Sequence, residues 1–219
     1  MKGYFITFEG PDGSGKSTVA KKICEKLMVD GYEVVHTREP GGIEISEEIR
    51  NIILDPKNTA MDAKTEALLY AAARRQHLVE RVFPAVEQGK IVICERFLDS
   101  SLAYQGFGRK LGMQEVLDVN LFAIDNTYPD MTIYLDVDEQ IGLDRLKNRS
   151  FKDRLDQESI DFHHRVSQGY KEVLKKFADR IKVIDASKSL EEVVENSYKT
   201  VLGLINDNRW IKTKWTNCL

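Results

Sequence analysis

The sequence contains few cysteines and no long hydrophobic run, and each shortage excludes a class of protein. Only three of its 219 residues are cysteines, at Cys24, Cys94 and Cys218. Their odd number and wide spacing exclude a disulfide framework and a paired-cysteine zinc site, so we expect a reducing, cytoplasmic environment. No apolar run approaches the ~18 residues that a bilayer-spanning helix needs. The N-terminus also lacks the ordered regions of a signal peptide, so we expect no membrane partner.

The net charge of the chain is also small. The 32 basic and 35 acidic residues nearly cancel to a net charge of -3. A chain so nearly neutral has no global attraction for nucleic acid or for an anionic membrane, and we expect no nucleic-acid partner. Any affinity for anions must therefore be local.

Short apolar runs alternate with long amphipathic segments. The strand candidates are residues 4–9, 33–37, 91–95, 131–137 and 181–186. Helical periodicity covers residues 16–28, 62–88, 138–148, 159–179 and 189–206. The alternation predicts one α/β domain over residues 1–206, with a doubly wound, five-stranded parallel sheet covered by helices on both faces. Ligands of such folds bind at the carboxyl ends of the strands. The charged stretch 148–157 is a candidate lid, and residues 207–219 form a C-terminal tail of unknown role.

A phosphate-binding loop follows the first predicted strand. "GPDGSGKS", residues 10–17, matches the pattern G-x-x-x-x-G-K-[ST] between a strand and a helix, and that context disfavours a chance glycine turn. Its glycines admit a close backbone approach, Lys16 reaches the β- and γ-phosphates, and Ser17 offers a hydroxyl to Mg²⁺. The loop thus predicts a P-loop NTPase. Its ATP-binding set is Gly10, Pro11, Asp12, Gly13, Ser14, Gly15, Lys16, Ser17 and Thr18.

Arginines gather where loops should line the ligand. Arg38 ends "HTR" and Arg96 follows "ICE", both at the carboxyl edge of a predicted strand; the others are Arg50, Arg74, Arg75, Arg109, Arg145, Arg149 and Arg154. Bringing a γ-phosphoryl group against a second phosphate needs several fixed cations. A phosphate acceptor needs no general base, whereas a sugar hydroxyl does. This pattern favours a nucleoside monophosphate kinase.

Five segments together resemble the thymidylate kinase family. They are "FEGPDGSGKST", "TREPGG", "LLYAAARRQH", "ICERFLDSSLAYQG" and "DRLDQE", in this order along about the first 205 residues. The resemblance implies a homodimer that transfers the γ-phosphoryl group of MgATP to dTMP, giving dTDP and ADP.

The resemblance also implies the acceptor site. Tyr70 matches the aromatic ring that stacks on thymine, Arg74 the arginine that bonds thymine O4, and Tyr104 the ring that crowds the sugar 2′ position. Asp12 matches the acid that faces the sugar 3′-hydroxyl. The implied dTMP-binding set is Asp12, Arg38, Pro40, Arg50, Tyr70, Arg74, Arg96, Ser101, Tyr104 and Gln105.

Catalytic and metal-binding residues follow from the same resemblance. Arg149 and Arg154 match lid arginines that close onto the transferring phosphoryl group, an effect worth on the order of 10³ or more in rate. Arg145 matches the arginine that packs on adenine. The implied catalytic set is Asp12, Lys16, Glu95, Arg96, Arg149 and Arg154. Mg²⁺ is assigned to Ser17 and Glu95, although the family usually has Asp at the latter position; Asp136 is the rival carboxylate.

Two alternatives stay open at this point. A deoxynucleoside kinase would accept thymidine itself and would use Glu95 as a general base. A nucleotide-binding switch would bind ATP and hydrolyse it slowly with no acceptor, but no guanine-specifying N-K-x-D motif is present, and "TREPGG" with "SSLAYQG" argues against a switch.

Overall fold

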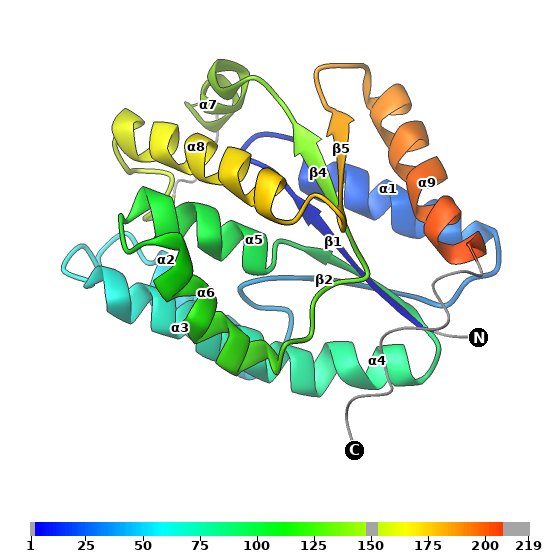
Figure 1. Ribbon diagram of the computed structural model, residues 1–219, viewed down its shortest axis with the longest axis horizontal. Helices are drawn as coiled ribbons and strands as arrows, with labels where there is room; N and C mark the ends of the chain where they lie inside the picture. The colour runs from blue at the N-terminus through cyan, green and yellow to red at the C-terminus, as the bar shows by residue number, and fades with distance from the viewer. Residues whose placement is uncertain (1–2, 148–152, 208–219) are drawn as a thin grey trace.

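The computed structural model describes residues 3–147 and 153–207, and within them all strands join one parallel sheet. The order is β2-β3-β1-β4-β5 (Figure 1). The strands are β1 (Tyr4–Glu9), β2 (Val34–Arg38), β3 (Ile91–Glu95), β4 (Met131–Asp136) and β5 (Ile181–Asp185). The predicted five-stranded parallel α/β fold is confirmed.

Helical segments connect the strands and cover both faces of the sheet. In chain order they are α1 (Lys16–Val29), α2 (Glu44–Leu54), α3 (Ala63–His77), the π-helical η1 (Leu78–Val82), α4 (Phe83–Glu87), α5 (Leu98–Ser101), the π-helical η2 (Leu102–Gly108), α6 (Met113–Ile124), α7 (Glu139–Lys147), α8 (Ile160–Lys176) and α9 (Leu190–Asn206). In Figure 1, α1 and α9 lie together on one side of the sheet, and α5, α6 and α8 lie on the other. None of the helices in the described ranges combines the length and hydropathy needed to cross a bilayer.

Two hydrophobic cores lie on opposite faces of the sheet, as the β1 side chains demonstrate. Tyr4, Ile6 and Phe8 join residues of α1 and α9 in one core. Phe5 joins the core beneath η1, η2, α6 and α8. Because both faces are covered, the strand is buried at every position rather than alternately exposed.

The helix expected over residues 62–88 runs without a break over residues 63–87, but it contains a π-helical turn. Asp62 caps α3 by accepting hydrogen bonds from the backbone of Lys64 and Thr65. The backbone then widens into η1, and α4 continues the helix with Pro84 near its start. Since proline donates no backbone hydrogen bond and its ring clashes with the preceding turn, a regular α-helical turn does not fit directly before it.

The segment "SSLAYQG", which by pattern alone favours a polar loop or a helix start, is helical throughout as α5 and η2. One glycine of η2 and one of α8 permit close packing between these two helices. A Cβ atom added at Gly108 would lie 2.7 Å from the ring of Phe162, and one at Gly169 would lie 2.9 Å from the Cα of Ala103. This close approach holds the Tyr104 ring of η2 beside the Tyr170 ring of α8. Helices α2 and α6 cover segments for which the sequence pattern predicted no element.

Candidate active site

The phosphate loop joins β1 to α1 at the carboxyl edge of the sheet. Gly13 and Gly15 adopt φ values of 78° and 88°, a region that side chains with a Cβ rarely occupy. No side chain caps the start of α1 at Gly15. The first amides of α1 are therefore available to a phosphate group, as the motif predicts.

Lys16 folds back over the loop that carries it. Its ammonium group donates hydrogen bonds to the carbonyl oxygens of Gly10 at 3.1 Å and Pro11 at 2.8 Å. Burial, and then the charge of Arg96, lower the pKa of Lys16 to about 7. A nucleotide phosphate would counter both effects, because it supplies negative charge where water is excluded.

The two predicted metal ligands contact each other. The Ser17 hydroxyl donates to Glu95 Oε2 at 2.5 Å, and the other carboxylate oxygen lies 2.9 Å from His36 Nε2. Burial by itself raises the pKa of Glu95, but hydrogen bonds from His36 and Ser17 outweigh it, and the net shift is downward. The rival Asp136 is exposed at the end of β4 and does not line the pocket. Of the two carboxylates, the structure therefore brings Glu95 to the phosphate loop.

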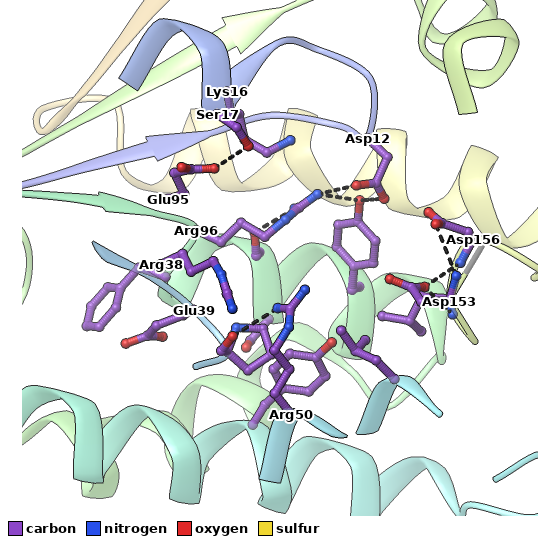
Figure 2. A pocket seen from close by; sticks show the side chains of 18 of the residues that line it. Asp12, Lys16, Ser17, Arg38, Glu39, Arg50, Glu95, Arg96, Asp153 and Asp156 are labelled. Atoms are coloured by element: carbon purple, nitrogen blue, oxygen red, sulfur yellow. Dashed lines mark hydrogen bonds and ion pairs between the residues drawn. The ribbon is translucent and has the colours of Figure 1, made fainter. Parts of the chain in front are cut away.

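A cavity of about 380 Å³ opens beside this loop (Figure 2). Its lining includes most of the predicted site residues: Asp12, Gly13, Gly15, Lys16, Ser17, Thr18, Arg38, Pro40, Arg50, Tyr70, Arg74, Glu95, Arg96, Ser101, Tyr104 and Gln105. The predicted residues Gly10, Pro11 and Ser14 belong to the loop but do not line the cavity. One continuous space thus reaches both the phosphate loop and the arginines of the neighbouring strands.

Asp12 directs its carboxylate away from its own loop, toward Arg96 and Tyr104. Arg96 Nη2 donates to Asp12 Oδ1 at 2.5 Å, and the Tyr104 hydroxyl donates to Asp12 Oδ2 at 2.5 Å (Figure 2). Both partners come from the β3–η2 region. The acid therefore does not oppose the anion-binding amides of its own loop; it is paired with groups on the far side of the cavity.

Arg74 is fixed at the floor of the cavity by buried partners. Its side chain is 2% exposed and forms an ion pair with Glu39 at 2.7 Å. It also donates to Ser101 Oγ at 3.1 Å and to the side-chain oxygen of Asn120. Tyr70 precedes it by one helical turn on α3, and burial, then the Glu66 carboxylate, raise the pKa of Tyr70. A neutral phenol ring and a rigid guanidinium group therefore face the same end of the cavity.

Arg38 and Arg50 form a cationic corner. Arg38 donates to Glu47 at 2.7 Å, while its Nη1 is buried and has no hydrogen-bond partner among the described residues. Arg50 donates to the Pro40 carbonyl oxygen at 2.9 Å. Burial and the neighbouring charge of Arg38 lower the pKa of Arg50. An anion bound between these guanidinium groups would relieve their repulsion and satisfy the free donor.

The predicted lid arginine Arg154 does not lie in the cavity. It is 7% exposed; its Nη2 donates to Glu66 at 2.5 Å and its Nε to the Ile53 carbonyl oxygen at 2.8 Å. Its neighbours Asp153, Leu155 and Asp156 line the cavity instead. A buried carboxylate on α3, which the sequence pattern did not reveal, draws the guanidinium group away. Arg149 and the side chain of Arg145 lie outside the described part of the chain.

Sequence reasoning missed several buried acids around the site. Glu9, the last residue of β1, accepts hydrogen bonds from the Phe97 amide at 2.7 Å and the Ser100 hydroxyl at 2.6 Å. Burial, and then nearby Asp99, raise the pKa of Glu9. Glu39 follows β2 and holds Arg74. Both acids come at the end of an apolar strand, and this position was the signal that could have identified them.

A phosphate loop and an arginine-lined acceptor cavity on one parallel sheet define a P-loop kinase of the nucleoside monophosphate kinase class. Residues 8–197 match the thymidylate kinase family. The thymidylate kinase of Geobacillus sp. (strain WCH70) is 55% identical over 207 residues, 94% of this chain and 99% of that protein. That of Clostridium novyi (strain NT) is 54% identical over 196 residues, 89% and 96% of the two chains.

A solved structure agrees with these relatives. The crystal structure of thymidylate kinase from Ehrlichia chaffeensis has a TM-score of 0.76 and 34% identity, covering 92% of this chain and 99% of that one. The chain belongs to the thymidylate kinase family, and the resemblance drawn from its motifs is confirmed. These comparisons give no support to the alternative in which thymidine itself is the acceptor.

Proposed function

We infer that the chain is a dTMP kinase, which transfers the γ-phosphoryl group of ATP to dTMP and releases dTDP and ADP. The observation that carries this conclusion is the shared cavity: the phosphate loop and the acceptor arginines line one space, and Asp12 lies at their junction. An acceptor phosphate oxygen is already a nucleophile. Catalysis is then a matter of positioning and of charge stabilisation, without a general base.

ATP is held, in this proposal, by the phosphate loop. The open amides at the start of α1 bind the phosphates, and Lys16 swings from its carbonyl partners to the β- and γ-phosphate oxygens. The set is Gly10, Pro11, Asp12, Gly13, Ser14, Gly15, Lys16, Ser17 and Thr18. Arg145 on adenine stays a prediction.

Mg²⁺ would be held by Ser17 and Glu95. Their direct contact supports this assignment, because a hydroxyl and an ionised carboxylate are hard oxygen ligands of the kind that Mg²⁺ prefers. When bound, the ion neutralises charge on the phosphate oxygens. His36, at hydrogen-bond distance from the other oxygen of Glu95, orients the longer side chain that this chain has in place of the usual Asp.

The acceptor dTMP fits the remainder of the cavity. We assign its phosphate to the guanidinium groups of Arg38, Arg50 and Arg96, and its thymine to the end lined by Tyr70 and Arg74. The further contacts proposed for dTMP are Asp12 and Tyr104 on the sugar, Ser101 and Gln105 near the base, and Pro40 beside Arg50.

The proposed catalytic groups differ in how far their placement supports them. Asp12, Lys16, Glu95 and Arg96 all line the cavity. Arg149 stays a prediction. For Arg154 the buried ion pair with Glu66 does not support direct contact with the transferring phosphoryl group.

We also propose a homodimer formed through α2, α3 and α6. Large apolar side chains are exposed on these helices: Phe122 is 89% exposed, Leu68 57% and Ile52 50%. Because α3 packs against both α2 and α6, exposed apolar side chains on these three helices favour an interface. A cytoplasmic location is proposed because Cys24 and Cys94 are both free thiols.

The proposed function is tested by comparing several phosphoryl acceptors. ADP release is measured with ATP and, in turn, dTMP, dCMP, UMP and thymidine. We expect dTMP to be strongly preferred. Equal rates with all pyrimidine monophosphates would overturn the base contacts, and preference for thymidine would overturn the phosphate acceptor.

Light scattering tests the dimer. Phe122→Lys is expected to lower the mass toward that of a monomer. Val29→Lys is the matched control, because Val29 is 87% exposed on α1, away from the proposed interface. A wild-type mass near that of a monomer would contradict the proposal.

A further inference from the structure

We propose that Glu66 is a positioning residue: it fixes the side-chain amide of Gln105 with its carbonyl oxygen presented to the acceptor base, and so selects a base that carries an N–H donor at ring position 3. This inference rests on the proposed dTMP kinase function and assigns part of its specificity to a residue outside the cavity lining.

The hydrogen-bond partners of Glu66 come from two other parts of the chain. The carboxylate, on α3, is 1% exposed. Gln105 of η2 donates from Nε2 to Glu66 Oε1 at 2.8 Å. Arg109, which follows η2, donates to Glu66 Oε2 at 3.1 Å, and Arg154 does so at 2.5 Å. The carboxylate therefore sits between one amide and two guanidinium groups.

These neighbours keep Glu66 ionised. Burial by itself raises the pKa of a carboxyl group, but hydrogen bonds from Arg109 and Gln105 and the charge of Arg109 outweigh burial, and the pKa of Glu66 is lowered. An ionised carboxylate only accepts hydrogen bonds. The Gln105 amide must therefore direct its NH₂ group toward Glu66, because the reversed amide would place two oxygens against each other.

The fixed amide leaves its carbonyl oxygen for the base. Gln105 lines the cavity and is 1% exposed. Among the described residues no hydrogen bond reaches its Oε1, whereas one N–H of its Nε2 donates to Glu66. Thymine carries N–H at position 3 and suits this acceptor; cytosine carries a bare nitrogen there and would face it lone pair to lone pair.

Glu66 removes an ambiguity that glutamine alone would have. A free amide turns to offer either a donor or an acceptor, so it discriminates poorly between the two bases. Arg74, at the neighbouring end of the cavity, has no such ambiguity, because a guanidinium group only donates hydrogen bonds. A buried polar mismatch costs about 1–3 kcal/mol, which corresponds to roughly 5- to 150-fold in selectivity.

The test is Glu66→Gln. A neutral amide at this position both donates and accepts, so Gln105 becomes free to turn. We measure kcat/KM for dTMP, for dCMP and for the thymidylate analogue with C–H in place of N3–H. The dTMP:dCMP ratio is expected to fall about tenfold or more, and the preference for dTMP over the analogue to fall with it.

Arg109→Lys is the matched control. It removes the guanidinium hydrogen bonds to Glu66 but keeps a positive charge beside the carboxylate, and it leaves the Glu66 and Gln105 contact in place. We expect a lower melting temperature with an unchanged dTMP:dCMP ratio. A merely structural role for Glu66 predicts that the two variants behave alike.

A double variant is designed to restore the dTMP:dCMP ratio, and it also tests the inference if Glu66→Gln alone fails to fold. Glu66→Gln combined with Gln105→Glu exchanges the two groups, and again presents only oxygen acceptors to the base. The ratio should return toward that of the wild type. A low ratio here, or a wild-type ratio in folded Glu66→Gln, overturns the inference. Failure of the wild type to phosphorylate dTMP would instead refute the proposed function.

Discussion

The charge of Lys16 is predicted to make ATP binding take up protons near neutral pH. In the protein without nucleotide, its pKa is lowered from 10.5 to about 7 by burial and by the charge of Arg96. The phosphates of ATP favour the charged ammonium group. Binding therefore requires protonation of the fraction that is neutral, and this fraction grows as the pH rises.

The magnitude follows from the pKa. At pH 7 about half of the free protein carries neutral Lys16, so binding takes up about 0.5 proton from this group; at pH 8 the uptake is about 0.9 proton. Below the lowered pKa the amine is already charged and affinity is independent of its titration. Above it, affinity falls with pH, by about fifty-fold between pH 7 and pH 9.

Titration calorimetry in two buffers of different ionisation enthalpy measures the uptake directly. The control is Lys16→Met, which has no titrating amine at this position and is expected to bind ATP more weakly and without the added uptake. ATP affinity that stays constant from pH 7 to pH 9, with no buffer-dependent heat beyond that of Lys16→Met, would refute the reasoning.

Three further predictions concern other parts of the site. Asp12→Asn should leave the Kd for ATP unchanged and raise the KM for dTMP about tenfold or more, because the charge-assisted hydrogen bond between Asp12 and Arg96 is lost. Unchanged dTMP kinetics would contradict this prediction. Arg74→Gln breaks a buried ion pair and should cost about 3–5 kcal/mol in denaturant unfolding, whereas Arg75→Gln, at an exposed pair, should cost about 1 kcal/mol or less; equal losses would argue against it. Glu95→Gln should raise the Mg²⁺ concentration for half-maximal rate about tenfold, and an unchanged requirement would exclude Glu95 as a ligand.

Much of the site was readable from the sequence because its signals are local. The phosphate loop depends on glycines at fixed spacing between a strand and a helix, and each requirement lies within eight consecutive residues. Arg38 and Arg96 were expected near one another because the ends of parallel strands meet at one edge, and both line the cavity. In the sheet, Arg38 and Phe8 are both in register with Glu95, which realises this expectation.

The sequence alone therefore determined the fold class and the presence of a phosphate loop. Both depend on periodicity and backbone geometry, which act over short distances along the chain. Only the tertiary structure decided how side chains pair. Arg154 reaches Glu66 across 88 positions, and Asp12 meets Arg96 across 84. Such pairs form where burial makes an unpaired charge costly, and burial is a property of the packed chain rather than of any segment of it.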